Sequence, residues 1–135
     1  GIGSIRQYYT NPGGVNMGFK QTVVFDFDGV INSYLSGWQG IDMIPDPPVD
    51  GIKEAIDNIR RKYRVVVVST RCHQEGGIEA IEAYLKKHGI VVDKVTMHKP
   101  PAKVYIDDRA IAFDGDAISL KDKIDSFIPW NKKYH

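Results

Sequence analysis

The chain has 135 residues, of which 42% are apolar and 26% charged, a composition typical of a soluble globular domain. A chain of this length favours one domain whose core needs no disulfide or structural metal. The formal net charge of +1 excludes an overall field that would attract nucleic acid or a membrane surface. No apolar run is long enough to span a bilayer. The single cysteine, Cys72, favours a reducing compartment, so we expect a cytoplasmic protein.

The first 19 residues show neither helical nor strand periodicity. They form either an N-terminal arm or, if Met17 is the native start, a remnant foreign to the native protein. We assign residues 20–130 to a single domain and residues 131–135 to a solvated basic tail.

The first predicted strand, residues 21–28, is an apolar run that ends in Asp26 and Asp28. The two-residue period of a strand directs both carboxylates to the same side, and Gly29 allows the chain to turn there. The following loop, residues 29–48, is long for a small domain, which favours a functional role. Its aromatic residues Tyr34 and Trp38 either cover the edge of the core or form a flap that touches substrate.

The remaining segments alternate between helix and strand patterns. Helices are predicted over 49–63, 75–88 and 119–128, where a capping box begins the last one, and strands over 64–68, 90–97, 104–106 and 111–113. Because the strands are apolar throughout, the pattern predicts an α/β fold with a mainly parallel sheet of about five strands and helices on both faces.

Polar residues follow three of the predicted strands. The carboxyl ends of parallel strands meet at one edge of a sheet, where ligands bind, so we expect the following residues to converge: Asp26, Asp28, Ser69, Arg71, Asp107 and Asp108. Carboxylates without histidine or cysteine suit a hard cation, for which Mg²⁺ is the natural choice. Ser69 and Lys99 add donors for anionic oxygens, so the set indicates phosphoryl transfer.

Four segments together resemble the haloacid dehalogenase superfamily of phosphohydrolases. They are Asp26-Phe27-Asp28-Gly29-Val30, Ser69-Thr70-Arg71, Lys99-Pro100 and Asp107-Asp108, each in the order and context of that superfamily's motifs. The resemblance covers roughly residues 21–113. It implies a three-layer Rossmann-like fold and a Mg²⁺-dependent phosphatase as the catalytic domain.

The resemblance also implies roles for the two carboxylates of the first motif. Asp26 is expected to attack phosphorus and form an aspartyl-phosphate, which a carboxylate can do when a metal screens the charges. Asp28 is expected to act as general acid and base. The metal is expected to bind Asp26, the backbone carbonyl of Asp28, and Asp107, Asp108 or both, with Asp107 favoured as a direct ligand and Asp108 as partly structural.

The resemblance implies that Ser69 donates a hydrogen bond to a phosphoryl oxygen and that Lys99 offsets negative charge. Thr70 is an alternative to Ser69, and Lys103 is an alternative to Lys99. Arg71 is expected either to bind substrate or to pair with Asp107 or Asp108.

Residues Asn32 and Gly29 complete the predicted substrate-binding set. The segments between the motifs are too short for a helical cap domain, so the chain looks like a capless member. Its expected partner is a phosphorylated substrate: a nucleotide, a sugar phosphate or a macromolecular phosphate end, with nucleic acid only as a substrate and with no membrane. A homo-oligomer is possible, because capless members can borrow a cap from another subunit. The alternative function is a non-catalytic phosphate-binding or regulatory protein of the same fold.

Overall fold

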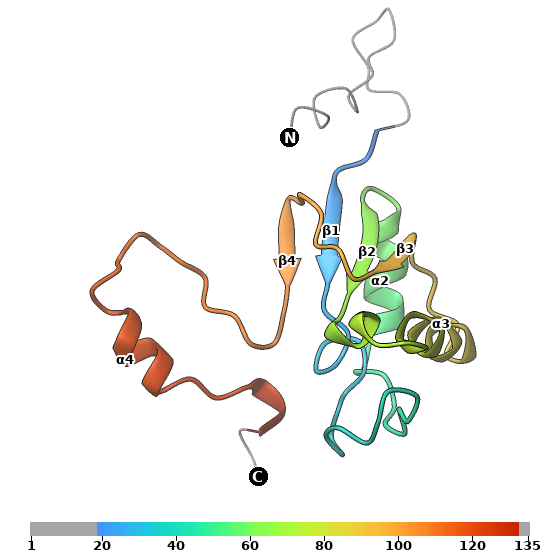
Figure 1. Cartoon of the computed structure of the whole chain (residues 1–135). Coiled ribbons are helices and arrows are strands. Elements are labelled where there is room, and N and C mark those ends of the chain that lie inside the picture. Colours follow the sequence, from blue (N-terminus) through green and yellow to red (C-terminus); the bar gives the residue numbers. More distant parts are fainter. Residues whose placement is uncertain (1–18, 133–135) are drawn as a thin grey trace, which may run out of the picture.

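The structure, a computed structural model, describes residues 19–132 (Figure 1). The predicted N-terminal segment, except for Phe19, and residues 133–135 of the predicted tail lie outside the described residues. The strands are β1 (Thr22–Phe25), β2 (Arg64–Val68), β3 (Lys94–Thr96) and β4 (Val104–Ile106). The helices are α2 (Ile52–Arg60), α3 (Gly77–Lys87) and α4 (Leu120–Asp125), with short 3-10 turns η1 (Thr70–His73) and η2 (Trp130–Lys132).

The strands form one parallel sheet in the order β3-β2-β1-β4. In its register, Phe25 of β1 lies beside Val67 of β2 and Ile106 of β4. The carboxyl ends of these three strands therefore reach the same edge. The predicted α/β fold with a parallel sheet is confirmed, and the sheet has four strands rather than about five.

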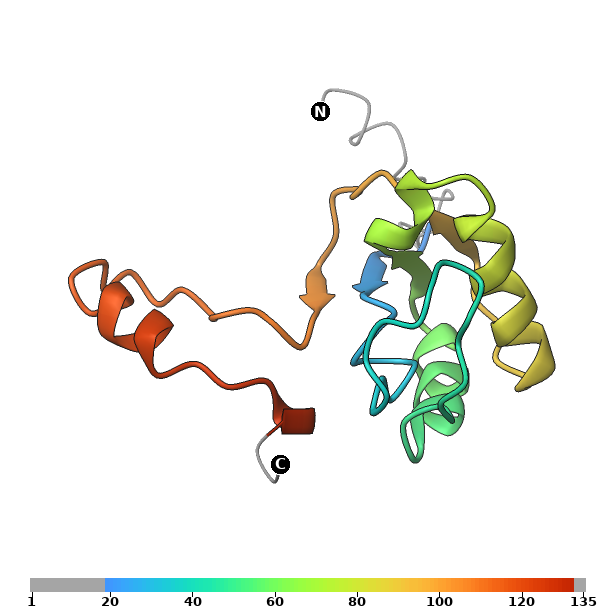
Figure 2. The ribbon, with the colours of Figure 1, turned by 60° about the horizontal axis from the view of Figure 1, so that its bottom comes forward.

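The core lies between the sheet and two helices that cover the same face. Alternate residues of β1 and β2 pack in one cluster with residues of α2 and α3, and the cluster includes Val23, Phe25, Val65, Val67, Ile56, Ile81 and Leu85. The predicted helices on both faces are therefore found on one face only in the part of the chain that the structure describes. The short connection from β3 to β4 contains no helix, and α4 stands away from the sheet (Figures 1 and 2).

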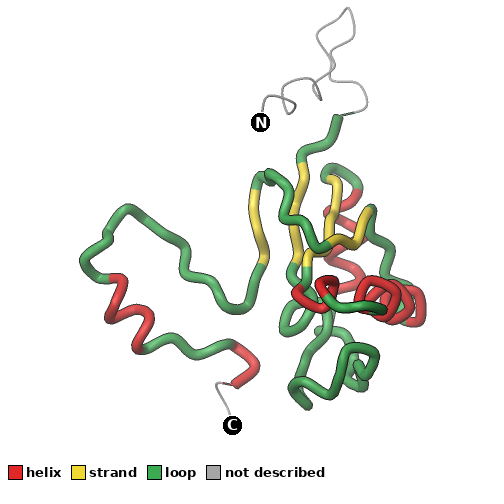
Figure 3. Tube along the Cα trace, in the orientation of Figure 1, coloured by secondary structure: helices red, strands yellow, loops and turns green. Residues whose placement is uncertain are grey.

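Several predicted elements are shorter in the structure (Figure 3). The strand predicted over 90–97 contains only Lys94–Thr96, and the segment 111–113 is a loop and not the predicted fifth strand. A short apolar run forms a strand only where a neighbouring strand and a packed face support it, and 111–113 has neither. Ser119 begins α4 without the predicted side-chain cap. Among the described residues, no helix is long and apolar enough to cross a membrane.

Candidate functional site

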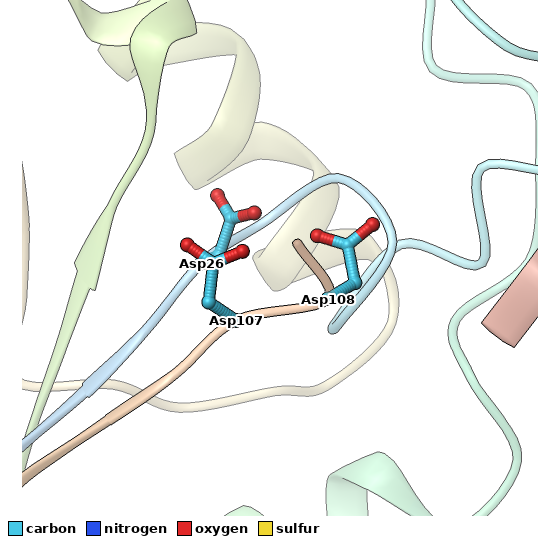
Figure 4. Close-up of side chains that lie close together, drawn as sticks. All are labelled: Asp26, Asp107 and Asp108. Carbon is cyan, nitrogen blue, oxygen red and sulfur yellow. The ribbon is translucent and has the colours of Figure 1, made fainter. Parts of the chain in front are cut away.

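Three carboxylates come together at the carboxyl edge of the sheet. Asp26 follows β1, and Asp107 and Asp108 follow β4, so the pairing of these neighbouring strands brings the residues side by side (Figure 4). One oxygen of each carboxylate lies within 4.8 Å of an oxygen of the other two. Asp107 is exposed, and the other two are half-buried. The predicted convergence of these three residues is confirmed.

The protonation of Asp26 reflects this crowding. Its pKa is raised from 3.8 to about 7, mostly by burial and also by Asp107 and Asp108, against the lowering effect of the hydrogen bond that the Phe27 backbone N–H donates at 2.8 Å. Burial also raises the pKa of Asp108. The cluster thus holds more negative charge than its surroundings stabilise, which a cation would relieve.

The donor set fits a hard divalent cation. All three candidate ligands are carboxylates, the oxygen donors that Mg²⁺ and Ca²⁺ prefer. Two oxygens on one Mg²⁺ lie at most about 4.2 Å apart, because each Mg–O bond is about 2.1 Å. The oxygens of the cluster are separated by up to 4.8 Å. A small side-chain adjustment or one bridging water therefore suffices for these residues to hold a metal ion.

Asp28 is held apart from this cluster by a buried arginine. Arg71 donates from Nε to Asp28 Oδ2 at 2.7 Å and from Nη2 to Oδ1 at 3.1 Å, and Asn32 Nδ2 donates to Oδ1 at 2.8 Å. Oδ1 thus accepts two hydrogen bonds, and Oδ2 accepts one. Since a carboxylate oxygen has two lone pairs, Oδ2 keeps one acceptor position.

The partners of Arg71 differ from those predicted. Its side chain is 1% exposed and pairs with Asp28, not with Asp107 or Asp108. Its Nη1 donates to the backbone carbonyls of Gly40 and Ile41 at 2.7 and 2.9 Å, and its guanidinium lies 4.5 Å from the ring centre of Trp38. Arg71 therefore connects the loop of residues 29–48 to the end of β1. Because its side chain is buried, it has little access to substrate.

Asn32 and Gly29 are both buried, and each has a structural role. Asn32 is 1% exposed, and besides holding Asp28 it accepts a hydrogen bond from the backbone of Tyr34. Gly29 has φ +85°, and a Cβ there would lie 2.1 Å from Asp108 Oδ2. Only glycine allows the turn after β1 to approach Asp108 this closely. The predicted substrate contact of Asn32 is not supported by its burial.

Of the predicted phosphate-binding side chains, Lys99 adjoins the cluster, and Ser69 is buried at the end of β2. The Oγ of Ser69 accepts a hydrogen bond from the Arg71 backbone, whereas the alternative, Thr70, is exposed. Lys99 lines a small pocket of about 100 Å³ together with Asp26 and Asp107. Its Nζ lies 4.2 Å from the ring centre of Tyr105, and no ion pair joins it to a carboxylate of the described residues.

The alternative lysine, Lys103, lies at the other end of the sheet. Its backbone N–H donates to the carbonyl of Thr22, where β1 begins. Parallel strands place the start of β1 opposite to the site, so Lys99 is the lysine that adjoins the carboxylates.

Two residues near the carboxyl end of the described chain have contacts that no sequence pattern predicted. Trp130 Nε1 donates to the carbonyl of Gly29 at 2.6 Å, and Asn131 Nδ2 donates to the carbonyl of Ser33 at 3.2 Å. Asn131 is 7% exposed, so its assignment to a solvated tail was wrong. These contacts join positions about a hundred residues apart, which no local pattern encodes.

A second pocket opens beside the carboxylates. It has a volume of about 220 Å³ and is lined by Gly29, Val30, Val49, Ile106, Asp107, Asp108 and Trp130. Its walls are largely apolar, and its carboxylates belong to the cluster. It provides room for part of a ligand next to the candidate metal site.

Comparisons with known proteins place few limits on this site. No protein-family model matches the chain, and no curated protein matches it. A chain in the structure of the Pnkp1/Rnl/Hen1 complex is similar, with 18% identity and a TM-score of 0.46. The match covers 85% of this chain and 37% of that chain, so this chain spans little more than a third of its length.

Proposed function

We propose that this protein is a Mg²⁺-dependent phosphatase that hydrolyses phosphoric monoesters through an aspartyl-phosphate. The observation that carries the proposal is the cluster of Asp26, Asp107 and Asp108 within 4.8 Å at the carboxyl edge of the sheet. The substrate class stays open between a nucleotide, a sugar phosphate and a macromolecular phosphate end.

In the first step, Asp26 attacks phosphorus, a P–O bond forms to its carboxylate, and the bond to the leaving alcohol breaks. Asp28 gives a proton to the leaving oxygen. In the second step, water attacks the same phosphorus, Asp28 takes the proton of that water, and the bond to Asp26 breaks to release inorganic phosphate. Asp28 Oδ2 has the acceptor position that this proton requires.

Asp26, Asp107 and Asp108 would hold the Mg²⁺, with the backbone carbonyl of Asp28 as a further ligand. When bound, the ion screens the charges of the phosphate and the carboxylates, which otherwise repel each other. Lys99, from the pocket that it shares with Asp26, adds positive charge on the same side. Ser69 donates its hydroxyl to a phosphoryl oxygen.

The test is the release of p-nitrophenol from p-nitrophenyl phosphate, with and without Mg²⁺. We expect turnover that requires the metal and that falls at least about a thousandfold in Asp26→Asn, since the variant lacks the nucleophile. Asp57→Asn is the matched control: it removes an exposed carboxylate on α2, in an ion pair with Lys53, and should keep full activity. Asp28→Asn should also lose turnover and can accumulate the phosphorylated protein, which intact-mass spectrometry detects.

The alternative is a phosphate-binding protein without catalysis. In that case a folded chain would bind inorganic phosphate in the presence of Mg²⁺ by calorimetry but would release no phosphate from nucleotides, sugar phosphates, phosphopeptides or phosphorylated DNA ends. That result would contradict the proposed phosphatase.

A further inference from the structure

The net charge of +1 hides a separation of charge between the two edges of the sheet. All four strands run parallel and therefore begin at one edge, here called the amino edge, opposite to the carboxylate cluster (Figure 1). The helices α2 and α3 also end there, because each leads into the strand that follows it. Nine basic residues lie at the strand starts, in the last two turns of these helices or in the turns that follow them: Lys20, Arg60, Arg61, Lys62, Arg64, Lys86, Lys87, Lys94 and Lys103. The same segments contain four acidic residues, Glu54, Asp57, Glu82 and Asp93, which leaves a net charge of +5.

The helix ends account for part of this positive charge. Arg60 lies in the last turn of α2, and Lys86 and Lys87 lie in the last turn of α3. A basic side chain at the carboxyl end of a helix interacts favourably with the helix dipole, so these residues stabilise their own helices. The basic residues at the starts of the strands have no such role.

Two of these strand residues point to the face of the sheet that the helices do not cover. Val65 of β2 and Val95 of β3 belong to the core cluster that packs against α2 and α3. Side chains alternate along a strand, so the adjacent Arg64 and Lys94 point to the opposite face. Both are exposed.

The strand register brings a third basic residue, Lys103, to the same face. Val104 lies beside the core residue Val23, so Lys103, one residue earlier, lies beside Thr22 on the open face. Arg64 lies beside Thr22 on its other side. Because neighbouring strands are about 4.8 Å apart, the backbones of Lys103 and Arg64 are separated by about 10 Å. The two cations therefore form a row across the amino edge with Thr22 at its middle.

The nearby carboxylates do not neutralise this row. The pKa of Asp93 is lowered, first by its hydrogen bonds from Arg60 and also by the charge of Arg64, so Asp93 lies near the row. However, its two oxygens already accept two hydrogen bonds from Arg60 and one from the backbone of Val65. Within residues 19–132, neither Arg64 nor Lys103 takes part in an ion pair. The row thus keeps its positive charge for a partner.

We propose that the amino edge binds the phosphate backbone of a single nucleic-acid strand. The separation of about 10 Å between Lys103 and Arg64 equals about three steps of a stacked strand, at about 3.4 Å per step. Lysine and arginine contacts to phosphates carry no sequence information, so binding is independent of base sequence. The surface lies opposite to the carboxylate cluster, and the proposal stands whether or not the protein is a phosphatase.

The composition of the row favours a nucleic acid over two other acidic partners. The centre of a protein–protein interface is apolar and poor in lysine. A peripheral membrane surface combines basic residues with apolar side chains that insert among the lipids. Here the middle of the row is the half-buried Thr22, and the residues on either side of it are cations.

The test is the fluorescence anisotropy of a labelled DNA strand of about 20 nucleotides, titrated with the full chain. The strand has no terminal phosphate and the buffer has no Mg²⁺, so the measurement does not depend on the proposed phosphatase. Three phosphate contacts predict a dissociation constant that rises about twentyfold between about 50 and 200 mM salt. We expect the double variant Arg64→Gln/Lys103→Gln to raise it at least about tenfold at the lower salt concentration and to reduce its salt dependence.

The matched control is Lys121→Gln/Lys123→Gln, which removes the same total charge from α4 and should leave binding unchanged. All four side chains are exposed, so circular dichroism should show an intact fold in both double variants. The absence of binding at the lower salt concentration, or an equal loss of binding in the two double variants, would overturn the proposal. Binding to phosphatidylserine vesicles or to polyglutamate, weakened by Arg64→Gln/Lys103→Gln and without binding to the DNA strand, would also overturn it, since the partner would then be a membrane or an acidic protein.

Discussion

Replacing Arg71 by methionine should destabilise the fold more than any other single ion-pair change in the described chain. The side chain is 1% exposed and donates four hydrogen bonds, two to Asp28 and one each to the carbonyls of Gly40 and Ile41. Methionine fills much of the same volume but donates none of them. The substitution therefore leaves a partly buried carboxylate and two carbonyls without their donor.

The magnitude follows from these lost partners. Breaking a buried ion pair by removing one member costs about 3–5 kcal/mol, because the remaining charge is uncompensated. Asp28 is 18% exposed and keeps its hydrogen bond from Asn32, which places the loss near the lower end. The two carbonyls add about 1 kcal/mol each. A total of about 5 kcal/mol is a large part of the 5–15 kcal/mol by which domains are stable.

The assay is urea unfolding followed by far-ultraviolet circular dichroism, with the free energy of unfolding taken from the midpoint and slope. Arg60→Met is the matched control. Arg60 holds Asp93 with the same two-point geometry, but both side chains are about 30% exposed, so its loss should cost at most about 1 kcal/mol. Equal losses in the two variants would refute the argument that burial makes the Arg71 pair important.

Two further predictions concern the carboxylate cluster. Gly29→Ala places a Cβ 2.1 Å from Asp108 Oδ2, so the carboxylate must move, and Mg²⁺ affinity measured by calorimetry should fall about 10–100-fold. Gly51→Ala, at a similar φ of +80° with nothing near the added Cβ, should leave that affinity unchanged, and equal affinity in both variants would contradict the role of Gly29. For Asp26, the folded pKa of about 7 lies above the unfolded value of 3.8, so the folded state binds the extra proton. Without metal, stability relative to Asp26→Asn should fall as pH rises from about 4 to about 7 and then stay level, as urea midpoints would show. A difference that does not change with pH would exclude the raised pKa.

The cluster at the carboxyl edge of the sheet could be predicted from the sequence, because its aspartates directly follow apolar strand segments. Val23 to Phe25 and Val104 to Ile106 are apolar runs that end in aspartates, and the parallel pairing of such runs is enough to bring their ends together. Residues 111–113 were wrongly predicted as a fifth strand, because an apolar triplet is a weak indication of a strand when no neighbouring strand pairs with it.

The partner of Arg71 could not be predicted from the sequence. Its position two residues after Ser69 was visible in the sequence, but its partner was not, because the choice between Asp28, Asp107 and Asp108 depends on the direction in which a buried side chain extends. The burial of Asn32 and the contact of Trp130 with Gly29 are also decided by packing between distant segments.

Amino-acid order by itself therefore determined which residues end the strands and which side of the sheet carries the acidic groups, because both depend on short-range periodicity. The tertiary structure alone decided which of these carboxylates lie together and which one is paired with an arginine. Asp26, Asp107 and Asp108 form a cluster suited to a cation, whereas Asp28 is paired with Arg71. That division depends on the long loop and on the arginine buried beneath it, whose contacts join residues about 30 to 40 positions apart.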